Sequence, residues 1–170
     1  LYRFRAPAPV VIRGGAESSV GPLAFCDWDQ DGDLDLFVGG RFVPGKIPRA
    51  GRTVLLVNEG RHFAEVSAIG PDLERIGMVS GAVFSDIDND RDPDLVLAMD
   101  WGAIELFLNQ EGQFVRATRA WGLEAYQGWW NGIATGDFDR DGKMDLVATN
   151  WGWNTPYQRY QSRPLHLYHG

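Results

Sequence analysis

The sequence predicts an all-β protein built from repeated units. Three observations support this prediction: three Asp-rich segments recur at similar intervals, the apolar runs are short, and Gly and Pro are frequent, with 21 and 9 of the 170 residues. The apolar runs are rich in Val, Leu and Phe and are bounded by Gly and Asp, which favours strands over helices. We therefore expect short strands joined by many turns.

The Asp-rich segments mark a repeat. They begin at Asp27, Asp86 and Asp137, so the intervals are 59 and 51 residues. A Phe lies 23 residues before the first Asp of each segment: Phe4, Phe63 and Phe114. Three equal spacings indicate repeat units, which we place at about 2–60, 61–111 and 112–170 of a single segment spanning 1–170.

Each unit is predicted to hold four short strands. An extended segment starts at the Phe, and the first apolar run ends at the acidic segment, at 22–26, 81–85 and 132–136. A second run follows it at 34–38, 95–98 and 144–148, and a third at 55–58, 106–109 and 165–168. Four-stranded units of this length are typical of β-propeller blades.

Three blades do not close a ring, because propellers typically have roughly 4–8 blades. Either the chain is part of a larger propeller or several copies assemble to complete one. We favour the first alternative, because open sheet edges invite aggregation. The chain begins at Leu1 without Met or a basic, apolar leader, so we expect a leader or further chain to be missing from the given sequence.

Composition narrows the function classes. The formal net charge of −7 argues against nucleic acids and anionic membranes as partners, and no apolar stretch approaches the ~20 residues of a membrane helix. The single Cys26 excludes an intrachain disulfide and a Cys-rich zinc site, and we expect it in the core. We find no Gly-x-Ser-x-Gly elbow, no phosphate-binding Gly loop and no distinctive carboxylate pair, so we predict that the chain is not an enzyme.

The three acidic segments have the pattern of metal-binding loops. Numbered from its first residue, each has Asp at positions 1, 3, 5 and 9, and position 7 can offer its backbone carbonyl whatever its side chain. Position 6 is Gly32 or Gly142, where a sharp turn requires positive φ. The predicted ligands are Asp27, Asp29, Asp31, Asp33 and Asp35; Asp86, Asp88, Asp90, Asp92 and Asp94; and Asp137, Asp139, Asp141, Lys143 and Asp145, with Asp33, Asp92 and Lys143 acting through their carbonyls.

Calcium is the expected ion, with two or three bound. It takes roughly 6–8 oxygen ligands, and it would remove a repulsion of about 4 kcal/mol between like charges ~4 Å apart at an effective dielectric near 20. An EF-hand is excluded because position 12 is Val38, Leu97 or Ala148 instead of Glu. Magnesium rarely uses all-protein cages. The alternative, a solvated acidic turn, is strongest for the second loop, where Arg91 replaces Gly at position 6 and Pro93 follows.

On these residues the chain resembles FG-GAP/VCBS-type calcium-binding repeats, which also build the integrin α-subunit propeller. The segments 38–45 and 129–132 are similar to bacterial FG-GAP repeat proteins, some of which carry an ASPIC/UnbV-like region. The resemblance implies a seven-bladed propeller with calcium between the first and second strands of each blade. It also implies an extracellular or cell-surface setting for a secreted protein, where millimolar calcium would fill weak sites.

The edge opposite the acidic loops is expected to be rich in aromatic residues. Because strand direction alternates, connections between strands two and three and between blades lie on that edge. Its candidate ligand-binding residues are Trp101, Trp129, Trp130, Trp151, Trp153 and Tyr157. Such residues suit contact with a protein or a glycan, and they equally suit packing between blades. The adjacent Trp129 and Trp130 should point to opposite sides of their strand.

These observations predict a calcium-binding extracellular scaffold for recognition or adhesion, in which calcium is structural. The alternatives are a lectin-like glycan-binding module and a non-catalytic accessory domain of a larger secreted enzyme. We expect no nucleic-acid partner and no membrane insertion. The remaining blades would come from the parent chain or from self-association.

Overall fold

The computed structural model describes residues 18–60, 62–66 and 69–151 of the chain, and in these ranges the fold is all-β with antiparallel pairing. Two short helical turns interrupt it, α1 (Pro71–Glu74) and the 3₁₀ turn η1 (Leu123–Ala125). The strands are β1 (Val20–Cys26), β2 (Asp35–Gly40), β3 (Val54–Asn58), β4 (Phe63–Glu65), β5 (Met78–Ser85), β6 (Asp94–Gly102), β7 (Glu105–Gln110), β8 (Gln113–Arg116), β9 (Gly128–Gly136) and β10 (Asp145–Asn150). None of the described helices is of a length and apolarity that would span a lipid bilayer.

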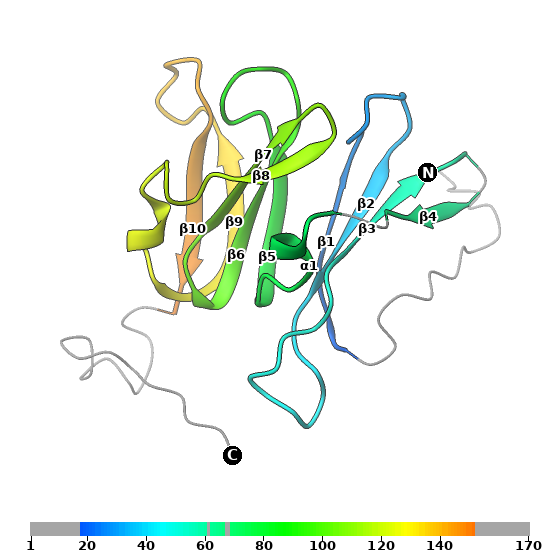
Figure 1. Ribbon diagram of the computed structural model, residues 1–170. Coiled ribbons are helices and arrows are strands. Elements are labelled where there is room, and N and C mark those ends of the chain that lie inside the picture. The colour runs from blue at the N-terminus through cyan, green and yellow to red at the C-terminus, as the bar shows by residue number, and fades with distance from the viewer. Residues whose placement is uncertain (1–17, 61, 67–68, 152–170) are drawn as a thin grey trace, which may run out of the picture.

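The strands form a four-stranded and a six-stranded sheet, and we describe the six-stranded one as a second and a third sheet, in the order of the chain. β1 to β4 make the first sheet, β5 to β8 pair in the same order to make the second, and β9 pairs with β10. At one end β9 also pairs with β6, Asp100 lying opposite Trp129, so the second and third sheets are joined there. The inner strand β5 contacts β1 on one side and β9 on the other, which gives the fanned arrangement of Figure 1.

The predicted strands are confirmed where the structure describes them. β1, β5 and β9 each end directly before the first Asp of an acidic segment, and β2, β6 and β10 each begin at its ninth residue. The runs at 55–58 and 106–109 are β3 and β7. The predicted repeat units and the sheets are out of step by one strand. Each unit begins with the strand predicted at its Phe, and for the second and third units this strand is the fourth strand of the preceding sheet in the structure. Phe4 and the run at 165–168 lie outside the described residues.

The core lies between the sheets. Phe37 and Leu55 of the first sheet pack with Leu95, Leu97 and Phe107 of the second, and all five are at most 1% exposed. The alternate β6 residues Val96 and Ala98 face the third sheet. A strand covered on both faces must be apolar along its whole length, which explains the unbroken apolar run of β6. The middle sheet is thus a blade packed between two neighbours.

The inner strands approach so closely that a side chain would clash at Gly21 and would be crowded at Gly81. A Cβ on Gly21 of β1 would lie 2.5 Å from the carbonyl oxygen of Val79 in β5. A Cβ on Gly81 of β5 would lie 3.1 Å from the Cα of Gly132 in β9. These contacts hold the inner edges of neighbouring blades together and bring their acidic loops side by side.

The two helical turns were not predicted. α1 begins with Pro71, whose fixed φ suits the first turn of a helix, and the buried Leu73 fills the space between the first and second sheets. The turn spans only four residues, too few to produce a helical repeat of apolar residues that the sequence could reveal.

Candidate metal centres

The three Asp-rich segments are the β1–β2, β5–β6 and β9–β10 connections, and all three lie along one edge of the fan, at the top of Figure 1. We refer to them as loop one (27–35), loop two (86–94) and loop three (137–145). The predicted alternation of edges is therefore confirmed for these loops.

Each loop turns sharply through two residues in the left-handed backbone region. The first is position 4 and the second is position 6, as follows: Gln30 and Gly32 with φ of 61° and 96°, Asn89 and Arg91 with 63° and 81°, and Arg140 and Gly142 with 67° and 84°. The prediction of positive φ at position 6 is confirmed. Arg91 adopts this conformation despite its side chain, at a cost of roughly 1–2 kcal/mol.

The same carboxylate contacts hold the turn in every loop. The backbone N–H of position 6 donates to the first Asp, from Gly32 to Asp27 (3.1 Å), Arg91 to Asp86 (3.1 Å) and Gly142 to Asp137 (3.0 Å). Position 5 donates to the third residue, and position 7 donates to the fifth, in all three loops. These bonds gather the carboxylates on the inner side of the turn.

The ninth carboxylate ties each loop to its blade. Asp35 accepts the N–H of Trp28 at Oδ2 and the N–H of Asn58 in β3 at Oδ1, both at 2.9 Å. Asp94 repeats this with Ile87 (2.7 Å) and Asn109 (2.9 Å). Both carboxylates are fully buried. The Asn at the end of the third strand is therefore part of the loop structure, a role that the sequence reasoning missed.

Carboxylate oxygens converge in each loop. One oxygen from each of three Asp residues lies within 4.8 Å of the others in the following sets: Asp27, Asp29 and Asp35; Asp86, Asp88 and Asp90; Asp137, Asp139 and Asp145. The remaining predicted carboxylates, Asp31, Asp94 and Asp141, accept backbone N–H groups within the same loops. Asp33 and Asp92 at position 7 are outside these sets, and the role of the position 7 carbonyl stays a prediction.

Two buried oxygens indicate that loops one and two fit a cation. Oδ1 of Asp27 and Oδ1 of Asp86 are buried and have no hydrogen-bond partner among the residues that the structure describes. An unpartnered buried carboxylate oxygen costs several kcal/mol unless a positive charge faces it. The donor set consists of hard oxygen atoms alone, which suits calcium better than zinc or copper.

Crowding also changes the acidity of the loops. Burial and then the charge of Asp35 raise the pKa of Asp29, and burial and then the charge of Asp90 raise the pKa of Asp88. Burial, with the charge of Asp35 second, raises the pKa of the neighbouring Cys26 thiol to about 12, so this buried cysteine is an unreactive core residue, as predicted. A cation in the loop would offset the burial of these carboxylates and relieve the repulsion between them, and so lower both pKa values.

The apolar residue at position 2 anchors two of the loops to the next blade. Trp28 packs on Phe114 of the second sheet with ring centroids 6.1 Å apart. Ile87 is 4% exposed in the core between the second and third sheets. Phe138 of loop three is 60% exposed. Loops one and two are thus each supported by the following blade.

The opposite edge carries an aromatic cluster. Trp129 stacks on Trp151 with centroids 4.2 Å apart, and it meets Trp101 edge-on at 5.3 Å. Its Nε1 donates to Asp100 (2.9 Å). Trp130 instead packs into the core between the second and third sheets, so the prediction that the adjacent pair points to opposite sides is confirmed. Trp153 and Tyr157 lie outside the described residues.

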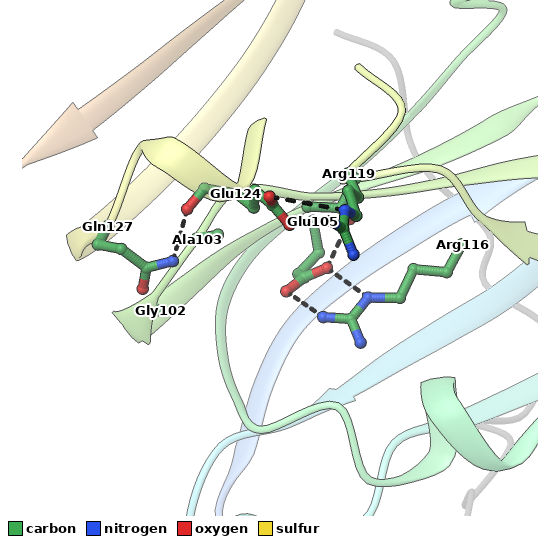
Figure 2. Close-up of a pocket in the computed structure, with 8 residues that line it drawn as sticks. Gly102, Ala103, Glu105, Arg116, Arg119, Glu124 and Gln127 are labelled. Carbon is green, nitrogen blue, oxygen red and sulfur yellow. Dashed lines mark hydrogen bonds and ion pairs between the residues drawn. The ribbon is translucent and has the colours of Figure 1, made fainter. Parts of the chain in front are cut away.

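A polar cleft of about 420 Å³ lies beside this edge and was not predicted (Figure 2). The buried Glu105 of β7 accepts two bonds from Arg116 (2.7 and 2.9 Å) and one from the hydroxyl of Thr118 (2.6 Å). These bonds raise the pKa of Arg116. Because the buried carboxylate is fully paired, we interpret these bonds as a structural link from β7 to the end of β8 and to Thr118 beyond it. Glu105 is separated in sequence from Arg116 by 11 residues and from Thr118 by 13, and no sequence pattern indicates that they pair.

Three sheets fanned about adjacent inner strands, each opening on an Asp-rich loop, define the chain as a set of β-propeller blades. The sequence matches the family of FG-GAP-like repeats twice, at residues 27–97 and 86–148, and the chain belongs to this family. It is also similar to cartilage acidic protein 1 of Homo sapiens, at 33% identity over 94 residues. That similarity covers 54% of this chain and 12% of the human protein, so the chain spans a small part of that relative.

Proposed function

We propose that this chain is a calcium-stiffened part of an extracellular scaffold for recognition or adhesion. The observation that carries the proposal is the pair of buried, unpartnered oxygens on Asp27 and Asp86, each at the head of a converging set of carboxylates. The family and the human relative support the extracellular setting, and extracellular calcium is millimolar, which would fill even weak sites. Membership of the FG-GAP-like repeat family and the similarity to cartilage acidic protein 1 support the interpretation of the chain as a module without catalytic activity.

In this proposal the carboxylates at positions 1, 3, 5 and 9 and the carbonyl at position 7 hold the ion. The ion supplies positive charge, which balances carboxylates that otherwise repel one another. The ninth Asp links the loop to the third strand of the blade, because Asp35 and Asp94 also accept the backbone N–H groups of Asn58 and Asn109. Ordering the loop would therefore also stabilise that strand. Binding energy then appears as folding energy.

Thermal unfolding tests this proposal. Chelator-treated protein should gain stability when millimolar calcium is added, and Asp27→Asn or Asp86→Asn should each remove part of the gain. Asp72→Asn, an exposed carboxylate of α1 outside the loops, is the matched control and should keep the whole gain. Equal gains in the loop variants and the unchanged protein would overturn the assignment of these loops.

The recognition surface is proposed at the aromatic edge. Trp101 and Trp151 are 40% and 42% exposed there, and exposed indoles suit contact with a protein or with the apolar face of a sugar. A lectin-like module is therefore the second candidate, and an accessory domain of a larger secreted enzyme is a third. On a glycan array, binding that is lost in Trp101→Ala and Trp151→Ala but kept in Phe138→Ala would favour the lectin.

Further blades are proposed to cover the outer face of the third sheet. Val96 and Ile87 of the second sheet are buried against the third, whereas their counterparts Val147 and Phe138 are 49% and 60% exposed. The resemblance to FG-GAP/VCBS-type proteins makes a seven-bladed ring the expected arrangement, completed by the parent chain or by further copies. The molar mass of this chain in solution separates the two sources, because only self-association raises it above that of one copy.

A further inference from the structure

We propose that Asn109 couples loops one and two, so that calcium in either loop raises the affinity of the other. This inference rests on the proposed function, because it assumes that both loops bind calcium. It concerns a positioning residue, since the side chain of Asn109 is not itself among the converging carboxylates.

The first half of the connection runs from Asn109 to loop one. The side-chain Nδ2 of Asn109 donates to the backbone oxygen of Trp28 (3.3 Å), across from the second sheet to the first. The N–H of the same Trp28 donates to Oδ2 of Asp35 (2.9 Å), and the Asp35 carboxylate belongs to the converging set of loop one. Asn109 therefore positions Trp28, and Trp28 in turn positions Asp35, a candidate calcium ligand.

The second half runs from Asn109 to loop two. Its backbone N–H donates to Oδ1 of Asp94 (2.9 Å), the ninth residue of that loop. Its side-chain oxygen accepts the N–H of Gly112 (2.9 Å), which fixes the orientation of the amide. Asn109 is 1% exposed, so water does not compete for these bonds. One buried residue thus bonds to both loops.

A second contact links the two loops at the surface. The side-chain amide of Gln30, at position 4 of loop one, donates to the Oδ1 of Asp92, at position 7 of loop two. Below it, Trp28 packs on Phe114, and Phe114 packs on Phe84 of the second sheet with centroids 6.3 Å apart. Loop one therefore rests on the blade that carries loop two through polar and aromatic contacts.

These contacts produce coupling because each loop must be ordered before it can bind. Calcium in loop one would fix Asp35 and Trp28, and with them the acceptor of Asn109 Nδ2. Loop two then loses less conformational entropy when it binds calcium, so its affinity is higher. Thermodynamic linkage requires calcium in loop two to raise the affinity of loop one by the same factor. Typical couplings of this kind change affinity by about 5- to 150-fold.

Asn58 provides a matched control. Asn58 is the last residue of β3, and Asn109 is the last but one of β7. Asn58 likewise donates its N–H to the ninth carboxylate of its loop, Asp35, and accepts the N–H of Gly60 (2.9 Å). In the part of the chain that the structure describes, its side chain makes no hydrogen bond to another sheet. Asn58→Ala therefore removes the same kind of turn contact without a link between blades.

The test is calcium calorimetry on the full chain with loop three silenced by Asp137→Asn. A further Asp27→Asn or Asp86→Asn leaves a single working loop, and the affinities of the two single loops are compared with those of the pair. We expect the pair to bind cooperatively, with each single loop weaker by about fivefold or more. Asn109→Ala should abolish this difference, Asn58→Ala should keep it, and the exposed Gln30→Ala should reduce it.

The outcomes separate the two proposals. If neither single loop nor the pair binds calcium, the proposed function fails. If both loops bind and the pair shows no cooperativity, the coupling alone is wrong. If cooperativity survives in both Asn109→Ala and Gln30→Ala, these contacts do not carry it. Should Asn109→Ala fail to fold, Gln30→Ala still tests the link between the loops, because Gln30 is exposed and lies outside the core. Unchanged cooperativity in that variant would overturn the coupling through these contacts.

Discussion

Arg41, in the connection that follows β2, donates through Nε to Oδ2 of Asp100 at the far end of β6, at 2.8 Å. The two residues belong to different blades, and Trp129 of the third sheet donates to the other oxygen of the same carboxylate. The side chain of Asp100 is only 8% exposed. One carboxylate therefore ties three blades together at the aromatic edge, opposite the acidic loops.

Asp100→Ala should destabilise the chain by about 3 kcal/mol. A hydrogen bond to a charged group contributes about 1.5–3 kcal/mol, and the substitution also leaves the indole N–H of Trp129 without its acceptor. Arg41 is 40% exposed, so water compensates part of its loss. Urea unfolding measures the change in free energy of unfolding.

The control is Glu124→Ala, because the exposed pair of Glu124 and Arg119 is 3.9 Å apart and should contribute at most about 0.5 kcal/mol. Equal effects of the two substitutions would show that Asp100 does not join the blades.

Arg91→Gly should stabilise loop two. The substitution relieves roughly 1–2 kcal/mol of strain at a φ of 81°, against about 0.5–1 kcal/mol of added freedom in the unfolded chain, so the net gain is about 0.5–1 kcal/mol. Gly142→Ala in loop three should have the opposite effect, because its φ is 84° and a Cβ there meets nothing within 4 Å. Thermal unfolding without calcium compares them. A loss of stability in Arg91→Gly would mean that its side chain makes contacts that outweigh the strain.

Gly81→Ala should destabilise the junction of β5 and β9, since the new Cβ would press on the Cα of Gly132 at 3.1 Å and on Ala98 at 3.2 Å. We expect a loss of about 1–3 kcal/mol, as in other overpacked cores. Gly132→Ala is the matched control, because Gly132 occupies the same position in the third sheet and its Cβ would approach only Thr149, at 3.5 Å. Urea unfolding measures the stability of both variants. Equal stability of Gly81→Ala and Gly132→Ala would contradict the close packing of the inner strands.

The strands and loops could be predicted from the sequence because the Asp pattern fixes them locally. The first strand must end before position 1, and the second must begin at position 9, where the buried carboxylates of Asp35 and Asp94 accept bonds from neighbouring backbone. Positive φ at position 6 was predictable from Gly32 and Gly142. Positive φ at position 4 was not, because Gln30 and Arg140 carry no such signal.

Contacts between blades could not be predicted in this way. Asn109 reaches Trp28 across 81 residues, and Arg41 reaches Asp100 across 59, over connections of variable length. Their pairing depends on how the sheets pack, which is a property of the assembled core. Of the predicted aromatic residues that the structure describes, Trp101, Trp129 and Trp151 lie together at the expected edge, but only the structure shows that Trp130 packs inward while Trp129 joins Trp151.

The most direct measurement is a calorimetric titration of chelator-treated protein with calcium, with the melting temperature followed in parallel. Our account predicts two or three sites and a clear rise in melting temperature, because the loops gain a counter-charge only in the folded state. The number of sites also decides whether loop two, with Arg91, is filled. No binding at millimolar calcium would contradict the account and leave three acidic turns without an ion.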